Sequence, residues 1–315
     1  MKTLHDAVAE YLTVRRAFGT QLREPAKRLS DFVAFLESEG AKFITTPLSL
    51  HWACQPEWAQ RATWARRLSI VRRFAAWLSA FDPRTEVPPR RLLEGRRQRR
   101  KPHIFTDREV ERLMGSLAGL PSPTGLRALT HVTLVGLLAA TGLRPGEALA
   151  LDIDEVDLKD GVLAIRQTKF GKSRFVPVEQ STLAALMRYA ERRDELRPRR
   201  QTDAFLVSER GTRLEGCTAR RTFARALHAI GLRPPAKGGR IGRGPRLQDL
   251  RHTFATRRLI DWYRAGLDVE REMPKLAEYL GHVGVGHTYW YIEAVPELLQ
   301  LATERLTACQ RGGAR

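Results

Sequence analysis

A proline- and arginine-rich stretch, residues 84–102, constrains the fold more than any other feature of this chain. It reads RTEVPPRRLLEGRRQRRKP, and basic side chains dominate its second half. Prolines lack a backbone donor and neighbouring like charges repel one another, so such a stretch forms a solvated connection rather than a packed element. We therefore expect a basic linker over residues 84–102. It would separate a domain of residues 1–83 from one of residues 103–315, each long enough to bury a core.

The first of these domains has the apolar spacing of helices. Residues 3–18, 25–39 and 62–80 each place apolar side chains three and four positions apart, which puts them on one face. Gly40 and Pro83 end the second and third of these patterns. The N-terminal domain is therefore expected to be helical.

The second domain begins with a helix signal and then changes period. Thr106 and Glu109 have the spacing of a capping box before a helix of residues 110–117. Residues 153–178 contain an Asp-Gly turn signal and two short apolar runs, which indicates a small antiparallel sheet. Further helical patterns cover residues 126–140, 180–197, 217–230 and a segment that starts at Pro145. The predicted fold class is mainly α with a small antiparallel β-sheet, an α+β arrangement.

The charge of the chain points to a polyanionic partner. Lys and Arg number 54 against 35 Asp and Glu, a net charge of +19. Residues 1–100 hold 19 basic and 10 acidic side chains, so both halves of the chain are basic. Nucleic acid is the first candidate and a membrane surface the second, while the simpler alternative is a charge that serves solubility.

Cysteine usage and the N-terminus indicate where the protein works. The three cysteines are scattered and show no CxxC spacing, which favours a reducing compartment and offers no zinc site. The first residues, MKTLHDAVAEYL, lack the apolar run of a signal peptide, and the most apolar stretch, residues 132–143, is too short to span a bilayer. We expect a cytoplasmic protein associated with the nucleoid.

Four segments hold side chains suited to phosphate chemistry, although each taken alone has an ordinary structural explanation. An arginine at a helix start can offer a planar fork to a phosphate or pair with a surface acid, and a hairpin lysine is commonly solvent-facing. Aromatic runs are more often core than catalytic. The segments are TGLRPGEAL (141–149), QTKFGKSRFVPV (167–178), LQDLRHTFAT (247–256) and YLGHVGVGHTYWYIEAVPEL (279–298).

In this order and spacing, the four segments resemble the tyrosine recombinase (phage integrase) family. TGLRPGEAL is similar to the family's first arginine box, TKFGKSRFVP to its lysine hairpin, and LRHTFAT to its second arginine box. LGH, followed by a tyrosine nine residues after the histidine, is similar to its final box. The helical N-terminal part also resembles the family's core-binding domain, so the resemblance covers nearly the whole chain. It implies that residues 1–83 clamp DNA and residues 103–315 are catalytic.

The resemblance implies a site-specific recombinase that cleaves and rejoins DNA strands through a 3′-phosphotyrosine intermediate. Tyr291 lies nine residues after His282 and would be the nucleophile, rather than Tyr289. Tyrosine has a pKa of about 10, so it needs cationic neighbours to act at neutral pH. The phosphotyrosine bond stores the energy for religation, so neither a metal ion nor ATP is expected as a cofactor.

Further roles follow from the same resemblance. Arg144 and Arg251 would bind the scissile phosphate and the charge that develops on it, and Glu147 would support them. Lys169 would protonate the leaving 5′ oxygen, and His282 would donate a hydrogen bond to a phosphate oxygen. Gln248 stands where the family usually has a histidine, and a glutamine can donate a hydrogen bond but cannot shuttle a proton.

Two alternatives to recombination remain open. The missing histidine at Gln248 favours a catalytically weak or silent relative that binds recombination sites as an architectural partner, and a topoisomerase-like enzyme would share the chemistry. The segment between Arg251 and His282 is longer than usual and is reminiscent of transposon-encoded recombinases that act with others, which implies a mobile element.

Double-stranded DNA is the expected partner. A C-terminal helix over residues 296–308 has a broad apolar face that must dock on a protein surface. We expect it to link subunits into assemblies of up to a tetramer on paired sites, and the alternative is that it docks onto its own domain. The arginines expected to contact DNA are Arg66, Arg67, Arg72, Arg73, Arg96, Arg97, Arg99, Arg100 and Arg243.

Overall fold

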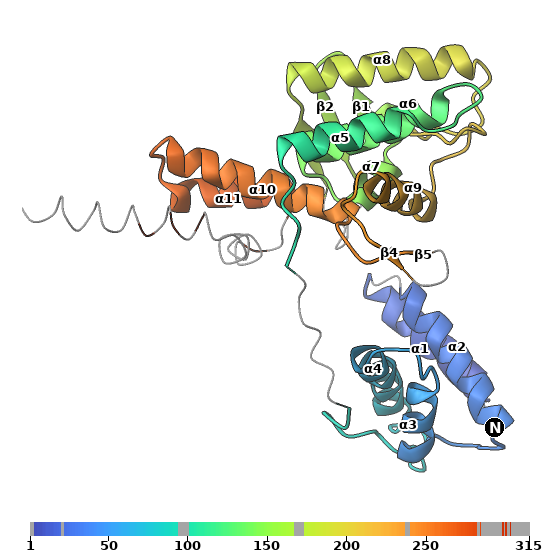
Figure 1. The fold of residues 1–315 in the computed structure, drawn as a ribbon. Helices are drawn as coiled ribbons and strands as arrows, with labels where there is room; N and C mark the ends of the chain where they lie inside the picture. The colour runs from blue at the N-terminus through green and yellow to red at the C-terminus, as the bar shows by residue number, and fades with distance from the viewer. Residues whose placement is uncertain are drawn as a thin grey trace, which may run out of the picture. The chain divides into compact units, whose positions relative to one another are not determined.

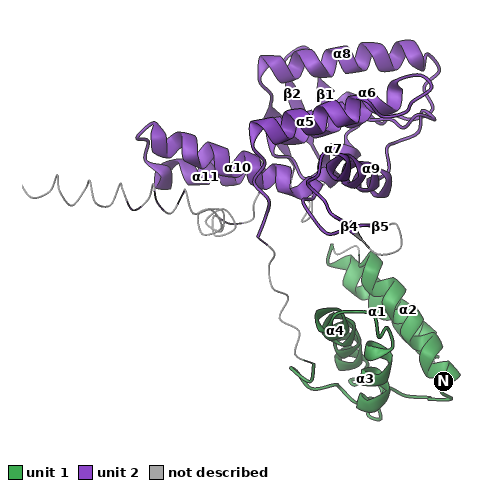
Figure 2. Cartoon of the chain, in the orientation of Figure 1, with its two compact units in different colours: residues 1–100 green, residues 101–315 purple. Residues whose placement is uncertain are grey.

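The chain divides into two compact units, Met1–Arg100 and Lys101–Arg315 (Figure 2). Separate clusters of buried apolar side chains lie in each unit. The basic end of the expected linker, residues 94–100, lies outside the described residues. The computed structural model describes residues 3–19, 22–93, 101–166, 173–236 and 240–281, with Gly284, Leu298, Gln300 and Thr303.

The N-terminal unit is helical. Thr3 and Asp6 form a capping box at the start of its first helix, with the Thr3 hydroxyl accepting from the Asp6 amide at 3.2 Å. Its core contains Phe32, Trp52 and Phe74, with the rings of Phe32 and Trp52 edge to face at 5.1 Å. The helices are α1 (Leu4–Ala17), α2 (Arg23–Ser38), α3 (Thr46–Cys54) and α4 (Arg61–Leu78) (Figure 1).

The C-terminal unit is built around α6 (Leu126–Thr141), whose side chains are apolar along most of its length. This helix packs against α5 (Asp107–Ala118), α8 (Gln180–Leu196) and α10 (Leu247–Arg264). Thr106 and Glu109 form the expected capping box at the start of α5. Two further helices, α7 (Pro145–Ala150) and α9 (Gly216–Ala229), pack against α6 and against each other.

A small antiparallel sheet joins α7 to α8. Its strands are β1 (Val156–Asp157), β2 (Val162–Ile165) and β3 (Arg174–Pro177), in that order. Ile165 pairs with Arg174, and this is the pair nearest to the segment that connects β2 to β3 in the sequence. The expected fold class, mainly α with a small antiparallel sheet, is confirmed. A second short antiparallel pair, β4 (Pro235–Ala236) with β5 (Arg240–Ile241), precedes α10 in the sequence.

The last described helices form their own cluster. After α10, Asp268 caps α11 (Val269–Leu280) by accepting hydrogen bonds from the first turn of that helix. Phe254 of α10 and Met273 of α11 pack together in this cluster, and Leu298, which is fully buried, packs there as well. Leu298 belongs to the expected C-terminal helix, most of which lies outside the described residues.

The described residues contain neither a membrane-spanning helix nor a metal-binding cluster. Within the described ranges, no helix is long and apolar enough to cross a membrane. Nor do the described histidines, cysteines and acids form a group of three that would hold a metal ion. Two cysteines, Cys54 and Cys217, are described as free thiols.

Candidate active site

The site begins where α6 ends. Gly142 has a φ of +62°, a left-handed conformation that side chains with a Cβ rarely adopt. A Cβ at this position would also lie 2.5 Å from Cδ1 of Phe254, so the backbone approaches α10 closely. The turn then places Arg144 at the N-cap of α7, with Pro145 in the first helical turn.

Glu147, one turn into α7, is an almost buried carboxylate held by two arginines. Its side chain is 8% exposed, and it accepts from Arg144 Nη1 at 2.6 Å and from Arg174 Nη2 at 2.8 Å. Burial acts to raise the pKa of Glu147, but the hydrogen bonds and charges of Arg174 and Arg144 outweigh it and lower the pKa below its usual value. Glu147 is therefore anionic at neutral pH.

Arg251, near the start of α10, is 1% exposed and spans two helix ends. Its Nη1 donates to the carbonyl of Gly142 at 2.9 Å, and its Nη2 donates to the carbonyl of Leu280 at 2.7 Å. An arginine keeps its charge even when buried, because its guanidinium is a very strong base. The two predicted arginines, Arg144 and Arg251, are thus brought to the same region from different helices.

Three successive carbonyls at the C-terminus of α11 accept hydrogen bonds from three arginines. Arg174 Nε donates to Tyr279 at 2.9 Å, Arg251 to Leu280, and Arg144 Nη2 to Gly281 at 3.0 Å. The C-terminus of a helix carries partial negative charge, so it attracts guanidinium groups. Each Nη carries two hydrogens, so one that donates to a carbonyl retains a second for another acceptor.

Gly281 ends α11 in a conformation that requires glycine. Its φ is +68°, and a Cβ there would lie 2.8 Å from Nη1 of Arg174. The arginine cluster therefore contacts the residue that directly precedes His282 in the sequence.

Gln248 lines a basic cavity beside Arg144. The cavity has a volume of about 770 Å³, and among the described residues of its lining Glu147 is the one acid. Such a lining attracts anions such as phosphates. The arginines in the lining are Arg144, Arg166, Arg220, Arg233 and Arg246.

Three of the predicted catalytic residues, Lys169, His282 and Tyr291, lie outside the described residues. The structure brings together Arg144, Glu147 and Arg251, and places Gln248 in the same cavity lining as the first two. Sequence reasoning missed Arg174, although it lies in the quoted hairpin segment five residues after Lys169.

Two described tyrosines are unsuited to act as the nucleophile. Burial raises the pKa of Tyr279 to about 12, and its ring stacks on Phe254 at 5.7 Å. Burial also raises the pKa of Tyr189, which lies in the core. A nucleophilic tyrosine needs its anion stabilised, so both environments act in the wrong direction.

The arginines expected to contact DNA fall into different environments. Arg66 and Arg73 on α4 are exposed and Arg72 is partly exposed, as required for a DNA contact, while Arg66 pairs with Glu24. Arg67 is 8% exposed, donates to the carbonyl of Trp52 at 2.7 Å and lies 3.8 Å from the centre of its ring. Such burial gives Arg67 a role in the core and does not fit a DNA contact. Arg243 is exposed, whereas Arg96, Arg97, Arg99 and Arg100 lie outside the described residues.

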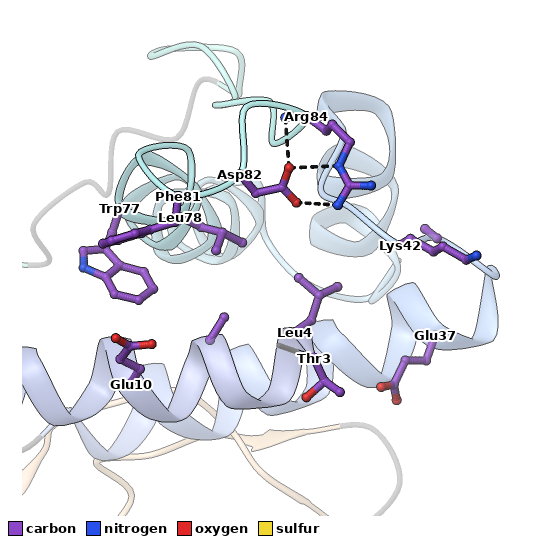
Figure 3. Close-up of a pocket in the computed structure, with 12 residues that line it drawn as sticks. Thr3, Leu4, Glu10, Glu37, Lys42, Trp77, Leu78, Phe81, Asp82 and Arg84 are labelled. Carbon is purple, nitrogen blue, oxygen red and sulfur yellow. Dashed lines mark hydrogen bonds and ion pairs between the residues drawn. The ribbon is translucent and has the colours of Figure 1, made fainter. Parts of the chain in front are cut away.

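A second hollow, in the N-terminal unit, has a different character. Its volume is about 620 Å³ and its lining includes Trp77, Glu10 and Glu37 (Figure 3). Asp82 in the same lining pairs with Arg84. In the described lining the three carboxylates Glu10, Glu37 and Asp82 outnumber the two cations Lys42 and Arg84, so this hollow does not suit a DNA backbone.

Comparisons with known proteins agree with one another. The model of the phage integrase family matches residues 103–297. A relative in Sinorhizobium fredii named as an integrase/recombinase, y4rB, is 44% identical over 97% of this chain and 98% of its own length. The tyrosine recombinase XerD of Neisseria meningitidis serogroup B (strain MC58) is 31% identical over 73% of this chain and 71% of its own. The Tn1549 transposon integrase, solved with transposon right end DNA, has a TM-score of 0.65 at 16% identity, covering 97% of this chain and 100% of that one.

Proposed function

This chain belongs to the phage integrase family of tyrosine recombinases, and from that premise we propose that it cleaves and rejoins DNA strands at specific sites through a 3′-phosphotyrosine intermediate on Tyr291. The observation that carries the proposal is the convergence of Arg144 and Arg251 on the end of α11, directly before His282. Two fixed guanidinium groups suit a phosphate that gains charge in its transition state.

In the proposed reaction the Tyr291 oxygen bonds to phosphorus while the bond from phosphorus to the 5′ oxygen breaks. Lys169 gives a proton to that oxygen, and His282 donates a hydrogen bond to a non-bridging oxygen. Rejoining reverses the step, as a 5′-hydroxyl from another strand attacks and Tyr291 leaves. One phosphodiester is exchanged for another, so the energy of the bond is conserved and no ATP is consumed.

Arg144 and Arg251 would interact with the phosphate in different ways. Arg144, whose side chain is 34% exposed, faces the basic cavity and would contact the phosphate directly. The more deeply buried Arg251 would stabilise the charge of the phosphate from below it. Gln248 would donate a hydrogen bond from the cavity wall. Because a glutamine cannot accept the proton that Tyr291 loses, that proton would pass to solvent water.

The rest of the chain is proposed to hold the DNA. Residues 1–83 and the basic linker 84–102 would form a clamp, with Arg66, Arg72 and Arg73 facing the duplex from α4. Exchange of both strands between two sites breaks four bonds, so four active sites, and hence a tetramer, would complete it. The proposal also implies a cytoplasmic enzyme that acts on a mobile element in the nucleoid.

A second candidate, a silent relative that only binds recombination sites, is favoured by Gln248. Retention of Arg144, Glu147 and Arg251 in one connected cluster favours the enzyme. The two differ in whether a covalent complex forms.

Strand exchange tests the proposal. A short labelled duplex and a longer unlabelled one, both from DNA flanking the coding sequence, are incubated with the protein and separated by length. Labelled product of a new length supports recombination, and Arg144→Ala should slow its formation by about 10²–10³-fold. Nicking and resealing without exchange would instead indicate a topoisomerase-like enzyme, and binding without any covalent complex would indicate the silent relative.

A further inference from the structure

Arg174 is the most constrained cation of the described hairpin. It is the first residue of β3, and its side chain is 12% exposed. Its Nη2 donates to Glu147 Oε2 at 2.8 Å, its Nη1 to Oε1 at 3.3 Å, and its Nε to the Tyr279 carbonyl at 2.9 Å. One guanidinium thus joins the sheet to α7 and to α11.

The groups that Arg174 holds are those that hold Arg144. Arg144 has two anchors, Glu147 Oε1 through Nη1 and the Gly281 carbonyl through Nη2. Arg174 donates to both oxygens of Glu147, so it fixes the orientation of the carboxylate to which Arg144 is anchored. It also binds the carbonyl two residues before Gly281 and packs so closely on Gly281 that a Cβ there would overlap it.

Electrostatics adds a second reason for Arg174 to be a cation. Glu147 is nearly buried and anionic, so it needs a cationic partner. Without Arg174, both oxygens of the Glu147 carboxylate could accept from the Arg144 guanidinium. A carboxylate and a guanidinium commonly form such a pair with two parallel hydrogen bonds. That pair would turn the Arg144 guanidinium towards Glu147 and away from a phosphate.

We propose that Arg174 is a positioning residue that fixes the Arg144 guanidinium for phosphate binding, because it holds both anchors of Arg144, the Glu147 carboxylate and the last turn of α11. This inference rests on the proposed function, in which Arg144 contacts the scissile phosphate. Arg174 itself acts through Arg144.

The test measures cleavage and binding separately with the full-length protein. A nicked suicide duplex from DNA flanking the coding sequence traps the covalent complex, whose rate of formation is followed at saturating protein, and binding is measured by fluorescence anisotropy. Misplacement of a catalytic group by an ångström costs about 10²-fold in rate, and Arg174→Ala should slow cleavage on that scale. Its affinity for DNA should fall no further than that of the control Arg192→Ala, which removes an exposed arginine paired with Glu195.

Two further variants separate positioning from stability. Arg174→Lys keeps the positive charge and the fold, but an ammonium group cannot donate to a carboxylate and to a carbonyl at once as a planar guanidinium does. This variant should therefore also form the covalent complex slowly. In an Arg144→Ala background, Arg174→Ala should cause no further loss, because both changes act on the same group. Melting temperatures identify any variant that fails to fold, in which case Arg174→Lys decides.

The inference is overturned if Arg174→Lys cleaves at the wild-type rate, if the two alanine changes multiply, or if Arg174→Ala slows cleavage no more than Arg192→Ala. Failure of the proposed function itself gives a different result. In that case the wild-type protein leaves no covalent complex, or Arg144→Ala cleaves normally, and both proposals are overturned.

Discussion

Replacement of Gly142 by alanine is predicted to destabilise the C-terminal unit and to disturb the active site. Gly142 has a φ of +62°, and the added Cβ would lie 2.5 Å from Cδ1 and 2.9 Å from Cγ of Phe254. The Phe254 ring cannot simply move away, because it stacks on Tyr279 and packs within the α10–α11 cluster. The Gly142 carbonyl also accepts the hydrogen bond from Arg251.

The size of the effect follows from two contributions. A left-handed conformation costs a residue with a Cβ about 1–2 kcal/mol. An overlap that forces packed side chains to shift costs about 1–3 kcal/mol more. Gly142→Ala should therefore lower the free energy of unfolding by about 2–5 kcal/mol.

Gly266→Ala is the matched control. Gly266 follows α10 in the same unit and has a φ of +68°, but nothing lies within 4 Å of a Cβ built there. It should lose only the conformational contribution, about 1–2 kcal/mol. Urea unfolding of both full-length variants, followed by circular dichroism, measures the difference, and trapping of the covalent complex measures the effect on cleavage.

The two variants must differ for the reasoning to hold. Equal losses of stability in Gly142→Ala and Gly266→Ala would show that the close approach to Phe254 has no cost. A normal cleavage rate in Gly142→Ala would show that Arg251 does not depend on the Gly142 carbonyl for its position.

Three further predictions concern other parts of the chain. Arg67→Met should destabilise the N-terminal unit by about 1–3 kcal/mol, because it loses the contacts with Trp52, and it should change the affinity for DNA little. The exposed Arg73→Ala should instead weaken DNA binding and change stability little. Weaker DNA binding by Arg67→Met at full stability would contradict this expectation. Burial acts to raise the pKa of Glu209, but hydrogen bonds around the start of α6 outweigh it and lower the pKa from the usual 4.5 to about 2. The ionised Glu209 carboxylate therefore stabilises the fold fully above pH 4.5, and this stabilisation is lost as the pH falls towards 2. Glu209→Gln should therefore be less stable than the wild type at pH 7, and acid titration should show the difference closing below pH 4.5; a constant difference would refute the assignment. Gln248→His should speed formation of the covalent complex on an isolated duplex if proton transfer is limiting, and an unchanged rate would show that it is not.

Periodicity predicted the long helices and the hairpin because burial follows the spacing of apolar residues. Helix α4 and the β2–β3 pair lie where their patterns placed them, within a residue or two. The short helix α3 was not expected, since its apolar side chains do not gather on one face. Its start is set instead by Thr45, which accepts from the Leu48 amide, and by Pro47 in the first turn.

Residue types alone did not reveal which arginines are buried. Arg66 and Arg67 are neighbours in one dibasic pair, yet one is exposed and the other stacks on Trp52, because a helix turns adjacent positions to different faces. Arg174 was missed for a related reason. Its acceptors, Glu147 and the Tyr279 carbonyl, lie 27 and 105 residues away in the sequence, so only the folded chain brings them together.

The identity of the attached residue tests the central claim most directly. The wild-type protein is trapped on a nicked suicide duplex, the complex is digested with nuclease and protease, and mass spectrometry locates the peptide that carries the nucleotide. We expect the 3′ phosphate on Tyr291, and Tyr291→Phe should bind DNA but form no covalent complex. Attachment at Tyr289 or any other residue, or a covalent complex formed by Tyr291→Phe, would contradict the account.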